Sequence, residues 1–174
     1  MISLIKHLFM KNSILTTTKF TLQTLFILLI SCGSSNETST IQLPDQTSEK
    51  AAIVSVSTSG NENAYTFNVE VLSPDKGCNQ YANWWEVLTE NEELIYRRIL
   101  GHSHVNEQPF TRSGGSVNIA KDQIVIVRAH MNTSGYGIKA FKGSVANGFV
   151  AFETNQGFAN DLATQSPLPS GCAF

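Results

Sequence analysis

Two stretches with strict alternation limit what this chain can fold into. In AYTFNVEVL, residues 64 to 72, apolar and polar side chains alternate from Tyr65 to Val71. QIVIVRAHM, residues 123 to 131, is similarly rich in β-branched residues. A period of two places alternate side chains on opposite faces of a β-strand. Both stretches are therefore predicted to be strands.

Further short segments have the same character, and turn signals separate them. They are residues 51–58, 81–89, 94–101, 116–120, 138–145 and 148–152. The glycine pair in TRSGGSV (111–117) is predicted to form a tight turn, and FANDLAT in the C-terminal tail a short helical turn. No long helical periodicity and no internal repeat is visible. Seven to eight closely spaced strands favour an all-β protein, an antiparallel β-sandwich.

The pattern resembles an immunoglobulin or fibronectin type III domain. A Trp-bearing strand, WWEV, is followed by a hairpin, and the long strand IVIVRAHM precedes the last strands. The resemblance implies an Ig-like sandwich over residues 51–174. The Cys-Trp-Cys framework of antibody domains is absent, since Cys78 precedes the Trp strand and Cys172 lies in the tail. A jelly roll or a small barrel remains open.

The first 31 residues have the composition of a signal peptide. Three lysines, at positions 6, 11 and 19, precede the apolar run LFILLI at 25–30, which is too short to span a bilayer. The segment from Met10 onward is a complete signal peptide by itself, so either Met1 or Met10 is the start. Residues 1–31 are therefore predicted to lie outside the folded domain.

The run ends in Leu-Ile-Ser-Cys, with Cys32 followed by Gly33. This resembles the lipobox of bacterial lipoproteins, which implies cleavage before Cys32 and acylation of its thiol. An ordinary signal peptide with a chance cysteine is the alternative. Gly33 in place of aspartate implies, by the family's sorting rule, the outer membrane of a bacterial cell envelope. Because each buried CH₂ contributes about 0.8 kcal/mol, two or three acyl chains would hold the protein at the membrane.

Residues 32–50 are predicted to be the acylated cysteine and a flexible tether. Serine, threonine, asparagine and glutamine dominate this segment. At about 5–6 Å × √n, it reaches on the order of 23 Å from the lipid. Two cysteines remain beyond it, Cys78 and Cys172, and export to an oxidising compartment predicts that they form a disulfide, which would pin the C-terminal tail to the domain. Two free thiols are the alternative.

The modest charge excludes one class of partner. The 174 residues carry a net charge of -2, and charged residues make up 15% of the chain. A nucleic-acid-binding domain would carry a basic field instead. The partners expected are the membrane, through the lipid, and an envelope protein or a small-molecule ligand.

Neighbouring strands are predicted to share a polar face. We assume that Trp85 and Val87 point into the core and that strand 123–131 lies beside strand 81–89. The alternate side chains of these strands and of the hairpin partner then point away from the core. That set is the candidate binding face: Trp84, Glu86, Arg97 (or Arg98), Arg128 and His130. A tryptophan beside guanidinium groups can hold a sugar, a carboxylate or a protein surface. The alternative is a solvated sheet face decorated with cross-strand Glu–Arg pairs.

Two histidines in LGHSHVNEQPF (100–110) suggest metal chemistry. His102 and His104 are two apart, so on an extended segment they point the same way, and His130 could supply a third ligand. With Met131 such a set would suit copper, and with Glu107 zinc. The alternative is a pair of surface polar residues in a loop.

No catalytic residues are predicted. G-x-S-x-G and H-E-x-x-H motifs are absent, and nothing in the sequence assigns Ser103 a base or an oxyanion hole. The sequence therefore favours a membrane-anchored lipoprotein whose sandwich binds a ligand or a protein without catalysis. A copper- or zinc-binding protein using His102, His104 and His130 is the alternative, and otherwise no cofactor is expected.

Overall fold

The computed structural model describes residues 49–173. The predicted signal peptide (1–31), Cys32 and nearly all of the tether lie outside the described residues. Within residues 49–173, no helix is long and apolar enough to cross a membrane.

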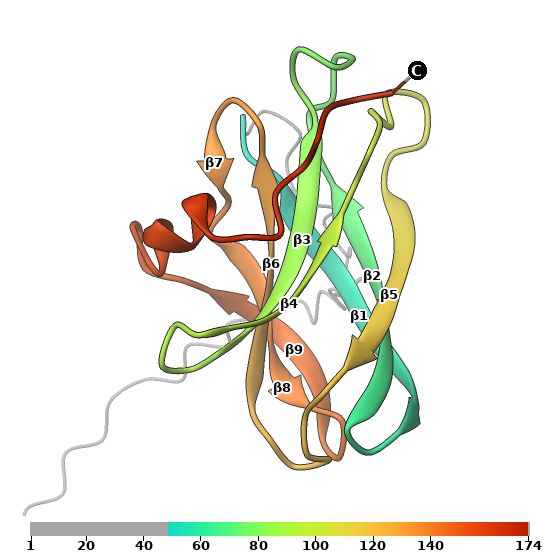
Figure 1. Ribbon diagram of the computed structural model, residues 1–174, viewed down its shortest axis with the longest axis vertical. Coiled ribbons are helices and arrows are strands. Elements are labelled where there is room, and N and C mark those ends of the chain that lie inside the picture. Colours follow the sequence, from blue (N-terminus) through green and yellow to red (C-terminus); the bar gives the residue numbers. More distant parts are fainter. Residues whose placement is uncertain (1–48, 174) are drawn as a thin grey trace, which may run out of the picture. The chain divides into compact units, whose positions relative to one another are not determined.

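The regular structure of the described chain is almost wholly antiparallel strands, which form two sheets (Figure 1). The smaller sheet has the order β1-β2-β5, and the larger has the order β4-β3-β6-β8-β9 with β7 paired to β6. The bounds are β1 Ala52–Asn61, β2 Ala64–Leu72, β3 Ala82–Thr89, β4 Leu94–Ile99, β5 Phe110–Val117, β6 Val125–Met131, β7 Gly135–Tyr136, β8 Lys139–Ser144 and β9 Gly148–Glu153. The predicted all-β, antiparallel sandwich is confirmed, with nine strands rather than seven or eight.

The core lies between the two sheets, because alternate residues of their strands face each other there. From the smaller sheet, Phe67 and Val69 of β2 are fully buried. From the larger sheet, Trp85 of β3 and Val127 of β6 join the same cluster. The alternation recognised in the sequence is thus the alternation between this core and the outer face of each sheet.

The prediction of a tight turn at the glycine pair of residues 111–117 is wrong, because this segment is most of β5. The glycines are needed for close packing instead. A Cβ on Gly114 would lie 2.9 Å from the Trp85 ring and 2.8 Å from the Tyr96 hydroxyl, and one on Gly115 would lie 2.9 Å from the Tyr65 carbonyl oxygen. Glycine lets β5 approach both the opposite sheet and its neighbour β2.

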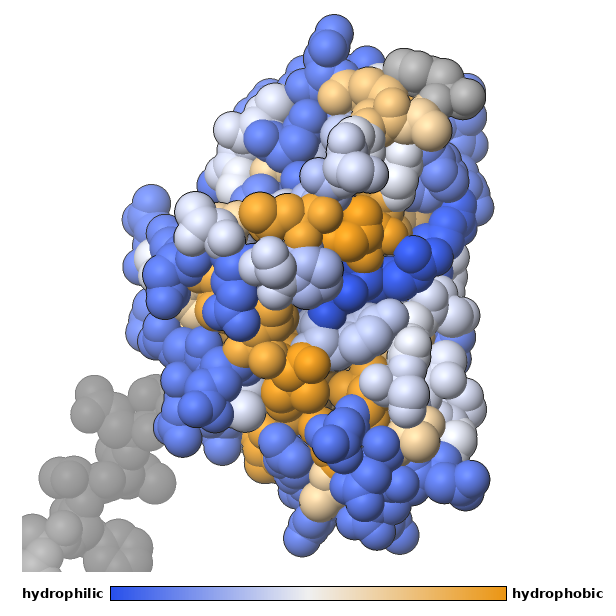
Figure 2. All heavy atoms as spheres, in the orientation of Figure 1, coloured by the Kyte–Doolittle hydropathy of each residue, from blue (hydrophilic) through white to orange (hydrophobic). Residues whose placement is uncertain are grey.

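After β9 the chain crosses the outer face of the larger sheet as a tail, residues 154–173. The tail forms a short 3-10 helix, η1 (Asn160–Thr164), beside β7 and then runs along β3 (Figure 1). This confirms the helical turn predicted in FANDLAT. Figure 2 shows the same side in space-filling form, with patches of hydrophobic residues along the middle bordered by hydrophilic ones.

Candidate functional site: the covered outer face and its cavity

Strand register brings the predicted polar face together. Glu86 of β3 is paired with Arg128 of β6 on one side and with Arg97 of β4 on the other. Of the two arginines considered in β4, Arg97 is therefore the one on this face. Arg98 is opposite Trp85 and donates from Nε to the Ser113 carbonyl oxygen instead.

One carboxylate serves both arginines. Arg97 reaches Oε2 of Glu86 through Nη2 at 2.6 Å and Nε at 2.8 Å. Arg128 reaches Oε1 through Nη2 at 2.8 Å and Nε at 2.9 Å. The three side chains are at most 1% exposed. Two buried cations share a single buried anion, so the cluster has one positive charge that no carboxylate in it balances.

The predicted exposure of this face is wrong, because the tail covers it. Trp84 is 2% exposed, and Glu86, Arg97 and Arg128 are buried. Arg97 donates to the carbonyl oxygens of Leu162 at 2.7 Å, Pro167 at 3.1 Å and Gln165. Arg128 donates to those of Ala159 at 2.8 Å and Phe158. The two guanidinium groups therefore satisfy five backbone carbonyl groups of the tail and hold it against the sheet.

Aromatic rings complete the cluster. The imidazole of His130 stacks on Trp84 with 3.8 Å between ring centroids, and the Arg97 guanidinium lies 4.4 Å from the Trp84 ring centroid. Arg128 lies 3.4 Å from the ring centroid of Tyr136. Burial, followed by the negative charge of Glu86, raises the pKa of the Tyr136 hydroxyl to about 12. Tyr136 is therefore a neutral phenol under ordinary conditions.

His130 is neutral as well. Burial, followed by the positive charges of Arg97, Arg128 and Lys50, lowers its pKa to about 3. Nδ1 of the ring lies 2.8 Å from the Asn83 side-chain oxygen, which can only accept, so Nδ1 carries the proton. The remaining nitrogen, Nε2, is then a hydrogen-bond acceptor.

A cavity of about 700 Å³ adjoins this cluster. Its walls come from the start of β1, the end of β2, the segment from β6 to β8, and the tail. Basic residues line it at several points, namely Lys50, Arg128 and Lys139, together with the neutral His130. No aspartate or glutamate is among the described residues of its wall. The lining of the cavity, as far as the structure describes it, therefore carries basic and no acidic side chains.

The loop of the two predicted histidines lies around a different buried carboxylate. Asp75 accepts from the backbone nitrogens of Ala82 at 2.9 Å and His104 at 2.8 Å, and from the Ser73 hydroxyl at 2.7 Å. His104 is 3% exposed and stacks on Phe110, with 3.7 Å between ring centroids. Burial, ahead of the charge of Arg112, lowers the pKa of His104 to about 4. The cluster joins the loop after β2 to the loop before β5.

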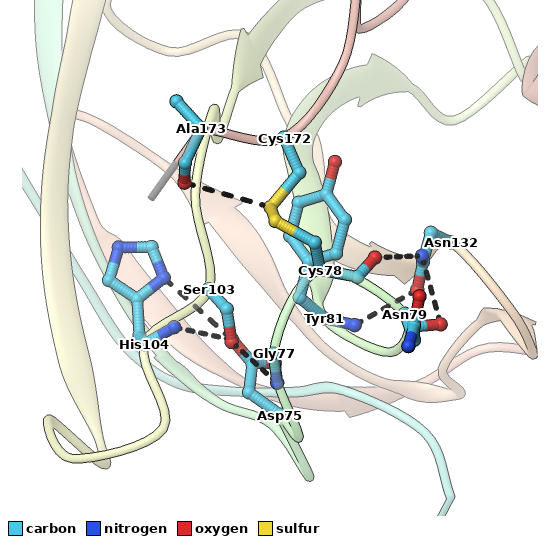
Figure 3. Close-up of a disulfide and its surroundings, with 10 residues drawn as sticks. All are labelled: Asp75, Gly77, Cys78, Asn79, Tyr81, Ser103, His104, Asn132, Cys172 and Ala173. Atoms are coloured by element: carbon cyan, nitrogen blue, oxygen red, sulfur yellow. Dashed lines mark hydrogen bonds and ion pairs between the residues drawn. A yellow bond between two sulfur atoms is a disulfide. The ribbon is translucent and has the colours of Figure 1, made fainter.

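The disulfide predicted from the cysteine count is confirmed. Cys78 and Cys172 are bonded, with 5.6 Å between their Cα atoms, and they lie beside the Asp75 loop (Figure 3). Ala173 next to it donates its backbone N–H to the Gly101 carbonyl oxygen at 2.7 Å. The end of the tail is thus fixed covalently and by a backbone hydrogen bond.

The three histidines proposed as metal ligands are not brought together. The rings of His102 and His104 are 4.4 Å apart between centroids, but His130 is engaged with Trp84 and Asn83. Among residues 49–173, no three His, Cys, Asp or Glu side chains are grouped so that they could hold a metal ion. Met131 is fully buried in the core, and Glu107 is paired with Arg112 at 2.7 Å.

Ser103 does not have the arrangement of an activated nucleophile. Its hydroxyl lies 3.4 Å from Asp75 Oδ2 and accepts from the Gly77 backbone nitrogen at 3.2 Å. Both ring nitrogens of His104 lack a hydrogen-bond partner, so the ring does not activate the serine.

Three parts of the site were not predicted from the sequence: Tyr136, Asp75 and the backbone of the tail. Asp75 lies in SPDKG, which looks like an ordinary loop, and Tyr136 in a predicted turn. One sequence feature did point to the tail. Cys172 lies near the C-terminus, and a disulfide from it would hold the tail against the domain.

Comparison with known proteins gives one relative. A protein of Halomicrobium mukohataei that is provisionally named a lipoprotein is 34% identical over 110 residues, which are 63% of this chain and 53% of that protein. The chain thus spans about half the length of the relative. No family model and no solved structure matches the chain, so the resemblance to immunoglobulin or fibronectin type III domains stays a prediction.

Proposed function

We propose that this protein is a membrane-anchored lipoprotein of the bacterial cell envelope, acylated at Cys32, whose sandwich binds a small ligand without catalysis. The lipobox after an apolar run supports the anchor, and so does the name of the relative in Halomicrobium mukohataei. Gly33 after the cysteine favours the outer membrane. The tether would keep the domain close to the membrane surface.

The cavity is the observation that carries the binding function. Its volume of about 700 Å³ lies within the range of about 300–1,000 Å³ typical of ligand sites. Apolar and aromatic side chains, among them Phe158 and Tyr136, lie in its wall beside polar groups from separate segments. Convergence of a few polar groups on a largely preformed hollow is characteristic of specific small-molecule binding.

We propose no catalytic role for the cavity. The neutral His130 has its Nδ1 engaged by Asn83, and Tyr136 is held as a phenol beside Glu86. The groups around the cavity are suited to hold and orient a ligand rather than to transform one.

Mass spectrometry of the protein purified from membranes tests the anchor. We expect the mature N-terminus at Cys32 with a diacylglyceryl group, and partition of the protein into the detergent phase. The variant Cys32→Ala should keep its signal segment and lose the lipid. A mature protein that begins elsewhere, or whose Cys32 carries a free thiol, contradicts the proposal.

A substitution that fills the cavity tests ligand binding. Ala163 lies in the cavity wall, so Ala163→Phe should occupy the ligand's space. Ala151→Phe, on the exposed surface of β9, is the matched control. In a thermal-shift screen of small metabolites, a ligand that stabilises the parent and the A151F protein but not A163F supports the site. If no ligand distinguishes the two variants, the cavity is not the binding site.

A further inference from the structure

We propose that the cavity selects an acidic sugar or a similar anionic polyol, an inference that rests on the ligand site proposed above. The ligand would carry a carboxylate or phosphate beside hydroxyl groups. The chemistry follows from charges and hydrogen-bonding groups that belong to four separate segments of the chain.

The first argument is the charge behind the cavity wall. Arg128 lines the cavity, and its partner Glu86 is shared with Arg97, so this buried group has a net positive charge. Carbonyl oxygens of the tail contribute dipoles to it but no negative charge. Because the Arg128 side chain is 1% exposed, water screens its charge little, and that charge acts on a ligand in the adjoining cavity.

The second argument is the charge on the cavity wall itself. Lys50, just before β1, and Lys139, at the start of β8, both line the hollow. Lys50 donates to the Ser134 carbonyl oxygen, which fixes its ammonium group beside β7. No carboxylate lies among the described lining residues, so the basic side chains of the wall attract an anionic ligand from more than one direction.

The third argument distinguishes a polyol from a simple anion. His130 lines the cavity as a neutral ring whose Nδ1 donates to Asn83, which leaves Nε2 as an acceptor. An acceptor beside cations is poorly suited to a bare anion but well suited to a ligand hydroxyl. Nε2 of His130 and Nζ of Lys50 lie 4.0 and 3.9 Å from the point where a Cβ on Gly135 would stand. Acceptor and cation therefore approach the same space, which the missing side chain of Gly135 leaves open.

Size is consistent with this class of ligand. A volume of about 700 Å³ exceeds what one sugar ring needs and accommodates an acidic sugar with a further ring or chain. Tyr136 and Phe158 provide aromatic surface for the apolar face of such a ring. The same chemistry occurs in free sugar acids and in the anionic headgroups of lipids.

The experiment is calorimetric titration of the full-length protein in detergent with matched probes. Glucuronate and glucose 6-phosphate carry both features, whereas glucose lacks the charge and cyclohexanecarboxylate lacks the hydroxyls. We expect glucuronate or glucose 6-phosphate to bind at least tenfold more tightly than either partial probe, and more weakly at high salt. Monomeric dihexanoyl phosphatidylglycerol represents the lipid source, and its binding relative to the sugar acids identifies which source is preferred.

Charge variants make the result specific to the cavity. Lys139→Glu should weaken binding of the anionic polyol at least tenfold, whereas Lys121→Glu, on the exposed loop before β6, makes the same charge change outside the cavity wall and should have no effect. Both lysines are exposed, so neither variant threatens folding. Equal affinity for glucose and glucuronate, or no effect of K139E, overturns the anionic specificity.

The two proposals fail in different ways. If a neutral ligand binds and A163F abolishes its binding, the cavity remains the ligand site but the anionic polyol is wrong. If anionic polyols bind equally to A163F and to the parent, the cavity itself is wrong.

Discussion

The two faces of β3 and β6 have the same alternation but are buried in different ways. The inner face, with Trp85, Val87 and Val127, is covered by the opposite sheet and is wholly apolar. The outer face, with Glu86 and Arg128, is equally buried but strongly polar. Burial of apolar side chains stabilises the fold in proportion to the area removed from water. Buried charged and polar groups cost free energy unless they find hydrogen-bond or ion-pair partners. The outer face therefore depends on one distant segment, the tail, and on the disulfide that fixes its end.

Removing the disulfide should have the largest effect on this contrast. The bond joins cysteines 94 residues apart, so the double variant Cys78→Ser, Cys172→Ser should lose about 4–5 kcal/mol of unfolding free energy in the chain-entropy model. Urea unfolding measures the loss. Hydrogen exchange in the native protein should become faster in the tail (154–173) than in β3 and β6. Equal acceleration in the tail and in both strands would show that the outer cover is not a separable part.

Removing the shared carboxylate comes next. Glu86→Gln keeps the shape but leaves two buried guanidinium groups without a counter-charge, which should cost about 3–5 kcal/mol. Val87→Ala, its neighbour on the inner face, should cost about 2 kcal/mol through the cavity that it leaves. Both values come from urea unfolding at pH 7. A smaller loss for E86Q than for V87A would mean that the outer cluster contributes little to stability.

Lowering the pH should reduce the free energy of unfolding through the two buried histidines, by less than either substitution above. The folded pKa values of His130 and His104, about 3 and about 4, lie below the ordinary value of 6.5. Because the unfolded chain takes up protons below pH 6.5 and the folded protein does not, stability falls as the pH drops from 6.5 toward these values. Burial is the first cause in both histidines.

Phenylalanine variants separate this effect from the titration of carboxylates. His130→Phe keeps a ring on Trp84, and His104→Phe keeps one on Phe110, but neither ring can be protonated. The difference in unfolding free energy between parent and variant should change in the variant's favour between pH 6.5 and pH 4. A difference that stays constant over this range would show that the histidine does not remain neutral in the folded protein.

Most of the fold could be predicted from local patterns, and the main error has a non-local cause. The strand over residues 64–72 matched within its limits because its alternation repeats the two environments of a sheet. β5 was missed because Gly114 and Gly115 are typical of turns. Glycine is needed at these two positions because a side chain would collide with the Trp85 ring or the Tyr65 carbonyl oxygen, which belong to other strands. A sequence pattern cannot show which distant group needs the space.

The residues of the outer face could be predicted from the sequence, but their burial could not. Alternation on adjacent strands placed Trp84, Glu86, Arg97 and Arg128 on one face, and the structure agrees. Their exposure was predicted wrongly because the tail that covers them has no periodicity. It attaches through carbonyl oxygens, which every residue has, and through a few apolar side chains, Phe158, Ala159 and Leu162, that pack near Leu88. So few apolar residues, without a regular spacing, do not indicate the contact in the sequence.

The sequence by itself determined that this chain forms antiparallel strands, which side chains share a face, and which cysteines remain to pair. These properties follow from the two-residue period of a strand and from counting. Only the tertiary structure decided that the charged face is buried, that His102, His104 and His130 do not form one site, and that a basic cavity lies beside the tail. Those outcomes depend on where a segment without regular pattern comes to rest, and that is set by long-range contacts rather than by local order.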